Sequence, residues 1–261
     1  MNAFSNRRRH PMAAVVVLLV ALGFVGGLYS LVSPTRQAQA ADSPASLQIA
    51  EGKGLFITSC SSCHGLNAEG TSDGPSLIGV GAAAVDFQVS TGRMPLQSKG
   101  AQAPKKKEAF NQEEINTMAA FIASLAPGPA IPAEEMYRTD GDLNEGGQIF
   151  RTNCASCHNF LGNGGALSRG KYAVSMKETS AKHIYEAMLT GPQSMPTFND
   201  GALTPEQKKD VITWLKYMHN SSDPGGYAAG RIGPVSEGLF LWTVVVGVLI
   251  AAAIWLGAKA T

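Results

Sequence analysis

Apolar residues gather in two uninterrupted runs, one near each end of the chain, and recur at helical spacing in the more polar stretch between them. Met12 to Val32 contain no charged residue over 21 positions, and Leu239 to Ala258 form a second uncharged run. At about 1.5 Å per residue, a helix of this length spans roughly 31 Å, which is enough to cross a bilayer. The pattern therefore predicts a transmembrane helix near either end.

Two segments of the polar stretch, NQEEINTMAAFIASL and TPEQKKDVITWLKYM, carry apolar residues at helical spacing. Asn111 and Thr204 begin these segments, and a side-chain oxygen at this position caps the first backbone N–H groups of a helix. Glu113 and Glu206 follow in the first turn, where acidic residues are favoured. Both segments are predicted to be amphipathic helices.

These helices belong to an internal repeat. EGKGLF at 51–56 returns as EGGQIF at 145–150, 94 residues further on. Each repeat reads as a short helix, a Gly-rich loop and a closing helix, and the prolines after residue 126 separate the two because proline cannot continue a helix. The predicted order is a terminal segment with its helix at 1–40, a first domain at 45–126, a linker at 127–135, a second domain at 136–221, a Gly/Pro linker at 222–238 and a helix at 239–258.

The chain has only four cysteines, and they form two Cys-x-x-Cys-His motifs at equivalent places in the repeats. Such a pair suits a zinc half-site, a redox disulfide or covalent attachment of a c-type haem. A zinc site built from both pairs gives the adjacent histidines no role. A redox disulfide expects a βαβ setting, and the chain shows little strand periodicity near either motif.

Haem attachment uses every residue of the motif. Two thiols on one helical turn can add to the two haem vinyl groups, and the next residue then presents its imidazole to the iron. Each repeat has only roughly 80 residues, so a covalently held porphyrin would supply apolar filling for a small core. The sequence predicts two haem c groups, one attached through Cys60 and Cys63 with His64 as axial ligand, the other through Cys154 and Cys157 with His158.

A haem that carries electrons needs a sixth ligand, and each repeat offers a Met-Pro loop before its closing helix. STGRMP contains Met94 and TGPQSMP contains Met195, and we predict that these methionines are the second axial ligands. Met118 is the other methionine of the first repeat but lies in the closing helix, whereas Met176, Met188 and His183 are rivals in the second. His/Met ligation raises the reduction potential and closes both irons to substrate.

The predicted fold is mainly α, with two tandem class I cytochrome c domains flanked by the two transmembrane helices. Basic residues lie at the outer edge of both apolar runs, RRRH before the first and Lys259 after the second. The positive-inside rule therefore places both chain ends in the cytoplasm and the haem domains on the extracytoplasmic side of the cell membrane. AQA at 38–40 also fits a signal-peptidase site, although the apolar run is longer than a usual signal-peptide core.

The net charge and the remaining motifs exclude several functional classes but do not identify a partner. The net charge of +1 identifies no partner. The run PKKK at 104–107 reads as a solvated loop, with steering of an acidic redox partner as the alternative. The chain shows no Walker loop, Rossmann fingerprint, zinc-protease helix or nucleic-acid motif, and none of its residues is predicted to be catalytic.

Beyond the haem motifs, four stretches carry a family resemblance: GPSLIGVGAAAVDFQVSTGRMP, NCASCHNFLGNGGALSRGKYA, AMLTGPQSMP and the terminal DPGGY with GRIGPVSEGLFLW. Together with the domain order they closely resemble the dihaem cytochrome c subunit of the actinobacterial cytochrome bc complex, the menaquinol–cytochrome c reductase. The resemblance implies a respiratory subunit that replaces both cytochrome c1 and the mobile cytochrome c. It implies as partners a cytochrome b subunit, a Rieske iron–sulfur subunit and an aa-type cytochrome oxidase joined in a supercomplex.

The resemblance also implies a route for electrons. The first domain would receive them from the Rieske centre, and the second would deliver them to the oxidase. Two other classes stay open: a dihaem subunit of a cbb-type oxidase, which usually lacks a C-terminal span, and a dihaem enzyme such as a peroxidase or thiosulfate dehydrogenase. An enzyme of this kind needs an exchangeable sixth position, which the two Met-Pro loops argue against.

Overall fold

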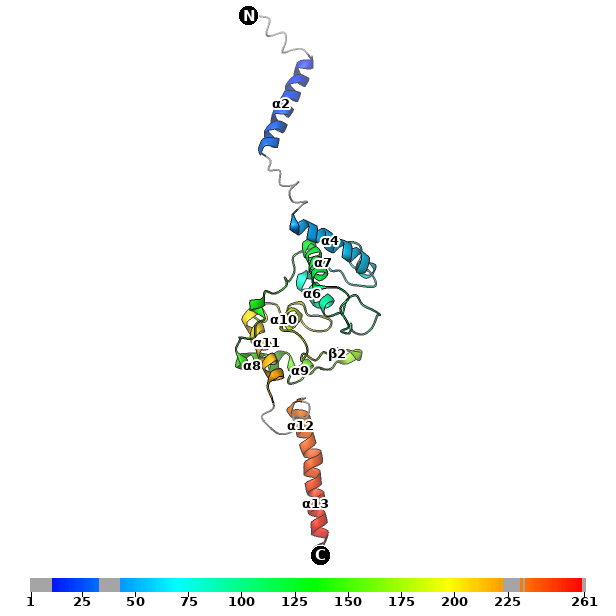
Figure 1. The fold of residues 1–261 in the computed structure, drawn as a ribbon, viewed down its shortest axis with the longest axis vertical. Helices are drawn as coiled ribbons and strands as arrows, with labels where there is room; N and C mark the ends of the chain where they lie inside the picture. Colours follow the sequence, from blue (N-terminus) through cyan, green and yellow to red (C-terminus); the bar gives the residue numbers. More distant parts are fainter. Residues whose placement is uncertain (1–10, 33–42, 223–230, 232, 260–261) are drawn as a thin grey trace, which may run out of the picture. The chain divides into compact units, whose positions relative to one another are not determined.

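The computed structural model describes residues 11–32, 43–222, 231 and 233–259 (Figure 1). The chain divides into one compact unit at residues 1–48 and another at 49–261. The basic RRRH segment, the AQA motif and most of the 222–238 linker lie outside the described residues.

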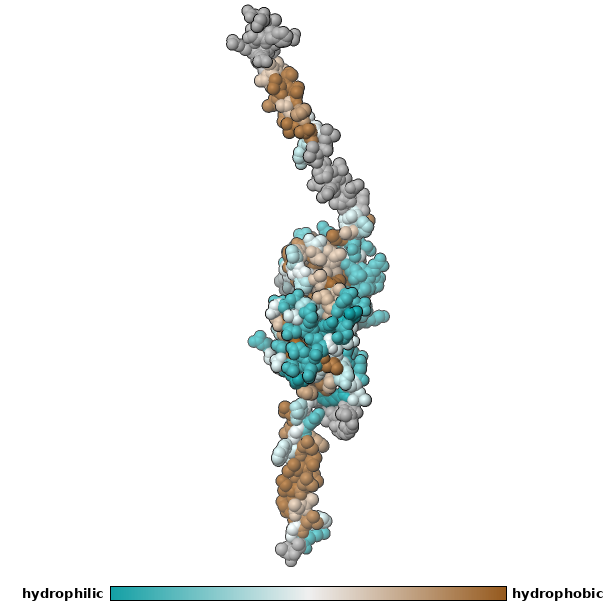
Figure 2. Space-filling view, turned by 90° about the vertical axis from the view of Figure 1, so that its left-hand side faces the viewer, coloured by the Kyte–Doolittle hydropathy of each residue, from teal (hydrophilic) through white to brown (hydrophobic). Residues whose placement is uncertain are grey.

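Both predicted apolar helices are confirmed. Near the N-terminus, α2 (Pro11–Val32) is one continuous helix. Near the C-terminus, α12 (Pro234–Phe240), the π-helical turn η4 (Leu241–Val245) and α13 (Val246–Lys259) follow without interruption. Both are long and apolar enough to cross a membrane, and their outer surfaces are hydrophobic (Figure 2).

The C-terminal helix begins earlier than the sequence suggests. Pro234 is its first residue, within the range expected to be a linker. Proline suits this place because the first N–H of a helix has no partner within the helix, and the ring holds a helical φ. Gly233 precedes it at φ 122°, a backbone conformation that side chains disfavour.

The first repeat consists of four helices. α4 (Pro44–Ser59) leads into the first Cys-x-x-Cys-His motif, which forms the short helix α5 (Ser61–His64). α6 (Gly81–Ser90) precedes the Met-Pro loop, and α7 (Gln112–Leu125) closes the repeat.

The second repeat follows the same plan with added elements. η1 (Glu134–Met136), a 3-10 turn, precedes α8 (Leu143–Asn153), and the second motif forms α9 (Ala155–His158). β1 (Gly165–Ala166) and β2 (Tyr172–Ala173) pair antiparallel around the 3-10 turn η2 (Ser168–Gly170). α10 (Ala181–Thr190) precedes the Met-Pro loop, and α11 (Pro205–Asn220) closes the repeat.

Both closing helices begin at the predicted caps. The Asn111 side chain accepts a hydrogen bond from the backbone N–H of Glu114, and the Glu114 side chain bonds back to the Asn111 N–H. Thr204 and Gln207 form the same reciprocal pair at α11. A capping box of this kind satisfies two N–H groups that the helix itself leaves without partners.

Leading and closing helices cross at a glycine in each repeat. A Cβ atom on Gly52 would lie 1.9 Å from the carbonyl oxygen of Thr117, and one on Gly146 would lie 2.0 Å from that of Asp210. Only glycine allows such an approach, since real Cβ contacts are never this short. The backbones of α4 and α7, and of α8 and α11, therefore touch directly.

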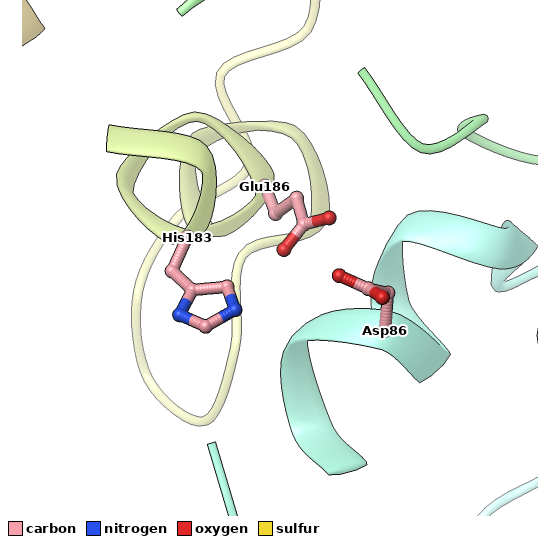
Figure 3. A group of neighbouring side chains, drawn as sticks. All are labelled: Asp86, His183 and Glu186. Carbon is pink, nitrogen blue, oxygen red and sulfur yellow. The ribbon is translucent and has the colours of Figure 1, made fainter. Parts of the chain in front are cut away.

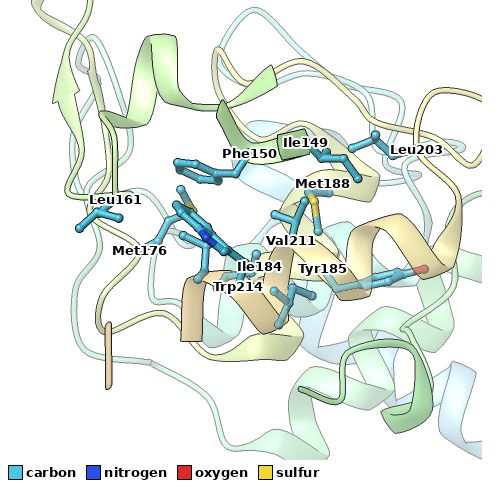
Figure 4. Packing of buried hydrophobic residues seen from close by; sticks show 12 residues of the cluster. Ile149, Phe150, Leu161, Met176, Ile184, Tyr185, Met188, Leu203, Val211 and Trp214 are labelled. Atoms are coloured by element: carbon cyan, nitrogen blue, oxygen red, sulfur yellow. The ribbon is translucent and has the colours of Figure 1, made fainter. Parts of the chain in front are cut away.

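An aromatic pair lies beside each crossing. The ring centroids of Phe56 and Phe121 are 5.3 Å apart, and those of Phe150 and Trp214 are 4.9 Å apart. Both distances fall in the range where aromatic pairs attract beyond their buried area. Phe150 and Trp214 belong to the larger apolar cluster of the second repeat, drawn in Figure 4. The two repeats are thus built on one packing scheme.

Candidate haem-binding sites

The first Cys-x-x-Cys-His motif forms one helical turn. Cys60 is the N-cap of α5, and the backbone N–H groups of Cys63 and His64 both donate to its carbonyl oxygen, at 3.2 and 3.0 Å. Cys60 is half-buried and Cys63 is exposed. The following loop wraps this turn closely, because the Thr71 hydroxyl donates to the Cys63 carbonyl at 2.6 Å. The motif therefore presents both thiols and the imidazole from one rigid turn.

The imidazole of His64 is held through one nitrogen. Its Nδ1 lies 2.7 Å from the carbonyl oxygen of Pro75. A carbonyl can only accept, so Nδ1 carries a proton, and in the neutral tautomer this leaves the lone pair on Nε2. A hydrogen bond of this kind orients a ligating histidine and sets its tautomer. Cys60 and Met94 pack against one apolar cluster, formed by Val89, Ile115 and Met118.

The second motif repeats this geometry. Cys154 caps α9, and Nδ1 of His158 lies 3.0 Å from the carbonyl oxygen of Val174. Val174 directly follows β2, so the two-stranded hairpin supplies the carbonyl that Pro75 supplies in the first repeat. Burial lowers the pKa of His158, which keeps the imidazole in its neutral, ligating form. The histidines of both motifs are thus prepared to bind a metal through Nε2.

A cavity of about 700 Å³ opens beside the second motif. Cys154, Cys157, His158 and Met195 all line it. Its volume falls within the range of roughly 300–1,000 Å³ that is usual for ligand and cofactor pockets. Two thiols, an imidazole with a free Nε2 and a thioether around one apolar cavity match the donor set of a covalently held haem with His/Met ligation.

The rivals of Met195 are placed differently. Met176 lies two residues beyond Val174, on the segment whose carbonyl holds His158, and Met188 is 2% exposed within the core cluster. His183 points its Nε2 toward the Ser90 hydroxyl at 2.9 Å, so that nitrogen already has a partner. Met176, Met188 and His183 nevertheless line the same cavity, so the assignment of Met195 rests on its place in the repeat.

None of the four cysteines, all of which lie in the described part of the chain, is joined in a disulfide. Burial, and secondarily the neighbouring Cys63, raises the pKa of Cys60 to about 11. Burial and Cys157 likewise raise the pKa of Cys154 to about 12. A thioredoxin-like site needs the opposite, a thiol with a lowered pKa that reacts as thiolate. The raised pKa values of Cys60 and Cys154 therefore do not favour the redox-disulfide alternative.

The first repeat contributes one wall of the second-repeat cavity, which the sequence analysis did not anticipate. Residues Phe87, Thr91, Arg93, Gln102, Pro104 and Lys105 all line it. The side chain of Gln102 bonds both backbone groups of Tyr172 in β2, each at 2.9 Å. The Ala103 N–H donates to Gln193 at 3.3 Å. The second site is thus completed by residues from the other domain.

The lysine run at 104–107 is only partly solvated. The Lys106 ammonium donates to the carbonyl oxygens of Gly92 and Pro95 at 2.5 and 2.6 Å. Both carbonyls belong to the loop that carries Met94. Lys106 is half-buried and supports this loop, whereas Pro104, Lys105 and Lys107 are exposed as expected for a solvated run.

A buried polar cluster joins α6 of the first repeat to α10 of the second (Figure 3). Lys182 Nζ lies 2.6 Å from a carboxylate oxygen of Asp86 and 3.8 Å from one of Glu186, and both carboxyl groups have no solvent exposure. Gln112 donates to Asp86 at 2.7 Å. The Lys182 ammonium supplies positive charge inside this cluster, so a metal ion is not needed to balance Asp86, His183 and Glu186.

The two acids of the cluster titrate in opposite directions. Burial, and then the neighbouring Asp86, raises the pKa of Glu186. Burial alone would also raise the pKa of Asp86, but the neighbouring Glu186, Lys182 and Gln112 lower it overall. The cluster therefore holds a neutral Glu186 beside an ionised Asp86, because two buried carboxylates at this distance do not both ionise.

No signal in a single sequence identifies most of these interdomain residues. Asp86, Lys182 and Glu186 read as ordinary helix charges. For Arg93 the sequence offers a weak indication. The two Met-Pro loops differ at the residue directly before the methionine, which is Arg93 in the first repeat and Ser194 in the second.

Two family models match the chain. The cytochrome c model matches residues 49–126, and the model of cytochrome c oxidase, cbb3-type, subunit III matches residues 141–215. These matches confirm the two tandem cytochrome c domains, and such domains imply covalently bound haem c. A cbb3-type cytochrome c oxidase subunit FixP of Sinorhizobium medicae is 26% identical over 42% of this chain.

Other relatives extend over almost the whole chain. A cytochrome bc1 complex cytochrome c subunit of Mycobacterium tuberculosis is 45% identical and covers 97% of this chain and 93% of its own length. Proteins of the same name from Mycobacterium leprae and Corynebacterium efficiens are 47% and 43% identical over 94% and 97% of this chain. This likeness confirms the resemblance found in the sequence and outweighs the shorter match to the cbb3-type subunit. The chain therefore belongs to the family of cytochrome c subunits of the cytochrome bc1 complex.

Proposed function

We propose that this chain carries electrons from a Rieske iron–sulfur protein to an aa-type cytochrome c oxidase, within a menaquinol–cytochrome c reductase that also contains a cytochrome b subunit. Two covalently bound haem c groups would supply the one-electron chemistry. The observation that supports this most directly is the pair of matched sites, each with two thiols and an imidazole whose Nδ1 is bonded to a carbonyl.

The residues of each site have distinct roles in this proposal. Cys60 and Cys63, and likewise Cys154 and Cys157, form the thioethers. His64 and His158 bind iron through Nε2, because a backbone carbonyl holds the Nδ1 proton of each. Met94 and Met195 close the sixth position. This ligand set gives a high potential and leaves no position for substrate, which favours an electron carrier over a peroxidase.

The first domain receives electrons in this proposal. Three exposed apolar side chains lie close in sequence to its haem-binding residues. Leu66, just after the haem motif, is 62% exposed; Ile78, in the following loop, is 50% exposed; and Leu96, just after Met94, is 38% exposed. Weak, small interfaces are typical of redox partners, and exposed apolar contacts suit them.

The terminal helices would hold both ends of the chain in the cytoplasm. Arg7 to Arg9 precede α2, and Lys259 ends α13. Basic residues are retained on the cytoplasmic side, so the stretch between the two helices would lie outside the cell membrane. This side is also where c-type haem is attached in bacteria.

Mild-detergent purification of the chain from its native membranes tests the assembly. The reduced-minus-oxidised spectrum is expected to show c, b and a haem bands together, because the reductase and the oxidase come along with the chain. Bands from c and b haem without a haem would remove the supercomplex from the proposal. Bands from c haem alone would contradict assembly with a cytochrome b subunit.

A further inference from the structure

Arg93 is a buried cation that faces a cavity. Its side chain is 7% exposed, and it lines the cavity beside the second Cys-x-x-Cys-His motif although it belongs to the first domain. The guanidinium lies 4.9 Å from the ring centroid of Phe87, which also lines this cavity. One face of the guanidinium is therefore covered by an aromatic ring.

This cation has no carboxylate to balance it. Across the part of the chain that the structure describes, no acidic side chain lies within ion-pair distance of Arg93, and its guanidinium makes no hydrogen bond. Glu178 is the one acidic residue that lines the cavity, and it interacts with Lys216. A buried charge is costly unless it is paired, and a guanidinium presents five N–H donors suited to a carboxylate.

The cavity is where such a carboxylate would be. A haem carries two propionate carboxylates, and the second-domain site already has the thiols, imidazole and thioether that the rest of a haem needs. We propose that Arg93 is a positioning residue for the haem of the second domain, and that its guanidinium supplies, across the domain boundary, the counter-charge for a propionate carboxylate. The inference rests on the proposed function, since it requires a haem in that cavity.

The contact between Arg93 and a propionate would link the two haem sites. Arg93 is adjacent to Met94, the proposed ligand in the first domain, so neighbouring residues serve the two sites. Ser194 stands before Met195 in the second repeat, where its hydroxyl bonds Lys171 at 2.8 Å. The buried positive charge therefore acts on the second haem, where it favours the reduced form and raises the potential.

The test compares Arg93→Gln and Arg93→Lys with the parent chain, each as full-length protein in detergent. Arg151→Gln is the matched control, because Arg151 is exposed on α8 and does not line the cavity. Intact mass first counts covalent haem, and a redox titration then resolves the two haem steps. Met195→His identifies the step of the second haem, since replacing the methionine ligand lowers that potential.

We expect the reduction potential of the second haem to be lower in Arg93→Gln than in the parent chain. It should fall less in Arg93→Lys, because lysine keeps the positive charge but lacks the planar set of guanidinium N–H donors. In Arg151→Gln it should not change. The propionate bands in the resonance Raman spectrum should change in Arg93→Gln and stay the same in Arg151→Gln. If Arg93→Gln fails to retain the second haem, Arg93→Lys decides: retention with a lowered potential agrees with the proposal, and loss of haem there too overturns it.

The outcomes separate this inference from the proposed function. Suppose the parent chain carries two covalent haems, and the potential of the second haem is the same in Arg93→Gln. This result would overturn the role of Arg93 and leave the proposed function intact. A parent chain with no haem in the second domain would overturn the proposed function, and the role of Arg93 with it.

Discussion

Gly52 and Thr117 approach so closely that a side chain at residue 52 would overlap the Thr117 carbonyl, with only 1.9 Å between this oxygen and an added Cβ atom. The contact joins the helix that leads into the first haem motif to the closing helix of the same repeat. Gly146 and Asp210 make the same contact in the second repeat. The haem motifs are thus positioned by two equivalent helix crossings.

Gly52→Ala is expected to lower the free energy of unfolding by about 1–3 kcal/mol, the range for overpacking a core, because the contact is with backbone that cannot rotate away. Gly54→Ala is the matched control in the same helix, since an added Cβ there meets nothing within 4 Å. Alanine has the higher helix propensity, so Gly54→Ala should stabilise the chain by up to about 1 kcal/mol. Chemical denaturation followed by circular dichroism measures both, and equal stability of the two variants would contradict the crossing.

Much of this architecture could be predicted from the sequence. The caps at Asn111 and Thr204, the two haem motifs and the terminal apolar helices all depend on local patterns, and the structure shows these helices where they were expected, except that the C-terminal one begins earlier, at Pro234. The helices α6 and α10 were not predicted. Part of the sequence of α6, GAAAVDFQVS, is small or polar, and the helix is buried both against α7 of its own repeat and against α10 of the second repeat, which lies far away in sequence.

The interdomain contacts could not have been predicted from one sequence. Ser90 and His183 meet at 2.9 Å although 93 residues separate them. Glu186 has the pattern of an exposed helix charge, yet its carboxyl group is fully buried. The hairpin at 165–173 has strands of two residues, too short for strand periodicity to be visible. These features depend on how the repeats face each other, which periodicity does not encode.

Met195→Ala should open the sixth position of the second haem. The variant is expected to bind carbon monoxide in the reduced state and to show a lower potential for that haem, because the methionine ligand that raises it is gone. Absorption spectroscopy under carbon monoxide measures the first effect and a redox titration the second.

Met188→Leu is the control for this substitution. Met188 also lines the cavity but belongs to the buried core, and a Met-to-Leu change conserves volume at a cost of less than about 1.5 kcal/mol. Its haem should stay closed to carbon monoxide. If Met188→Leu opened the iron and Met195→Ala did not, the ligand assignment would be wrong.

Glu186→Gln should flatten the pH dependence of stability above neutral pH. Burial and Asp86 raise the pKa of Glu186 above its unfolded value, so the folded chain keeps a proton that the unfolded chain releases. The stability tied to this proton is full below the unfolded pKa and falls as the pH rises, by up to about 1.4 kcal/mol per pH unit. Glutamine cannot titrate, and its amide replaces the neutral acid.

The other groups around Glu186 act in a different pH range. Burial lowers the pKa of His183, which costs stability only below about pH 6.5. The lowered pKa of Asp86, whose carboxylate lies 2.6 Å from Lys182 Nζ, acts below about pH 4. Urea unfolding between pH 7 and 8.5 isolates Glu186, with the exposed Glu135→Gln as control. A parent chain whose stability does not fall across this range would argue against a neutral Glu186.

Fusions to alkaline phosphatase, an enzyme that is active only outside the cytoplasm, should report the topology. A fusion after Ser222 is expected to be active, because the haem domains would lie outside the membrane. A fusion after Thr261 is expected to be inactive, because α13 would return the chain to the cytoplasm. The reverse pattern would contradict the orientation derived from Arg7 to Arg9 and Lys259.

The mass of the intact chain, purified after expression with haem attachment, tests the central claim most directly. The account predicts the mass of the polypeptide plus two haems. It also predicts that one haem remains in a variant with Cys60 and Cys63 both replaced by alanine, and one in the variant with Cys154 and Cys157 replaced. A parent chain with one haem or none, or a double-cysteine variant that still carries two, would contradict it.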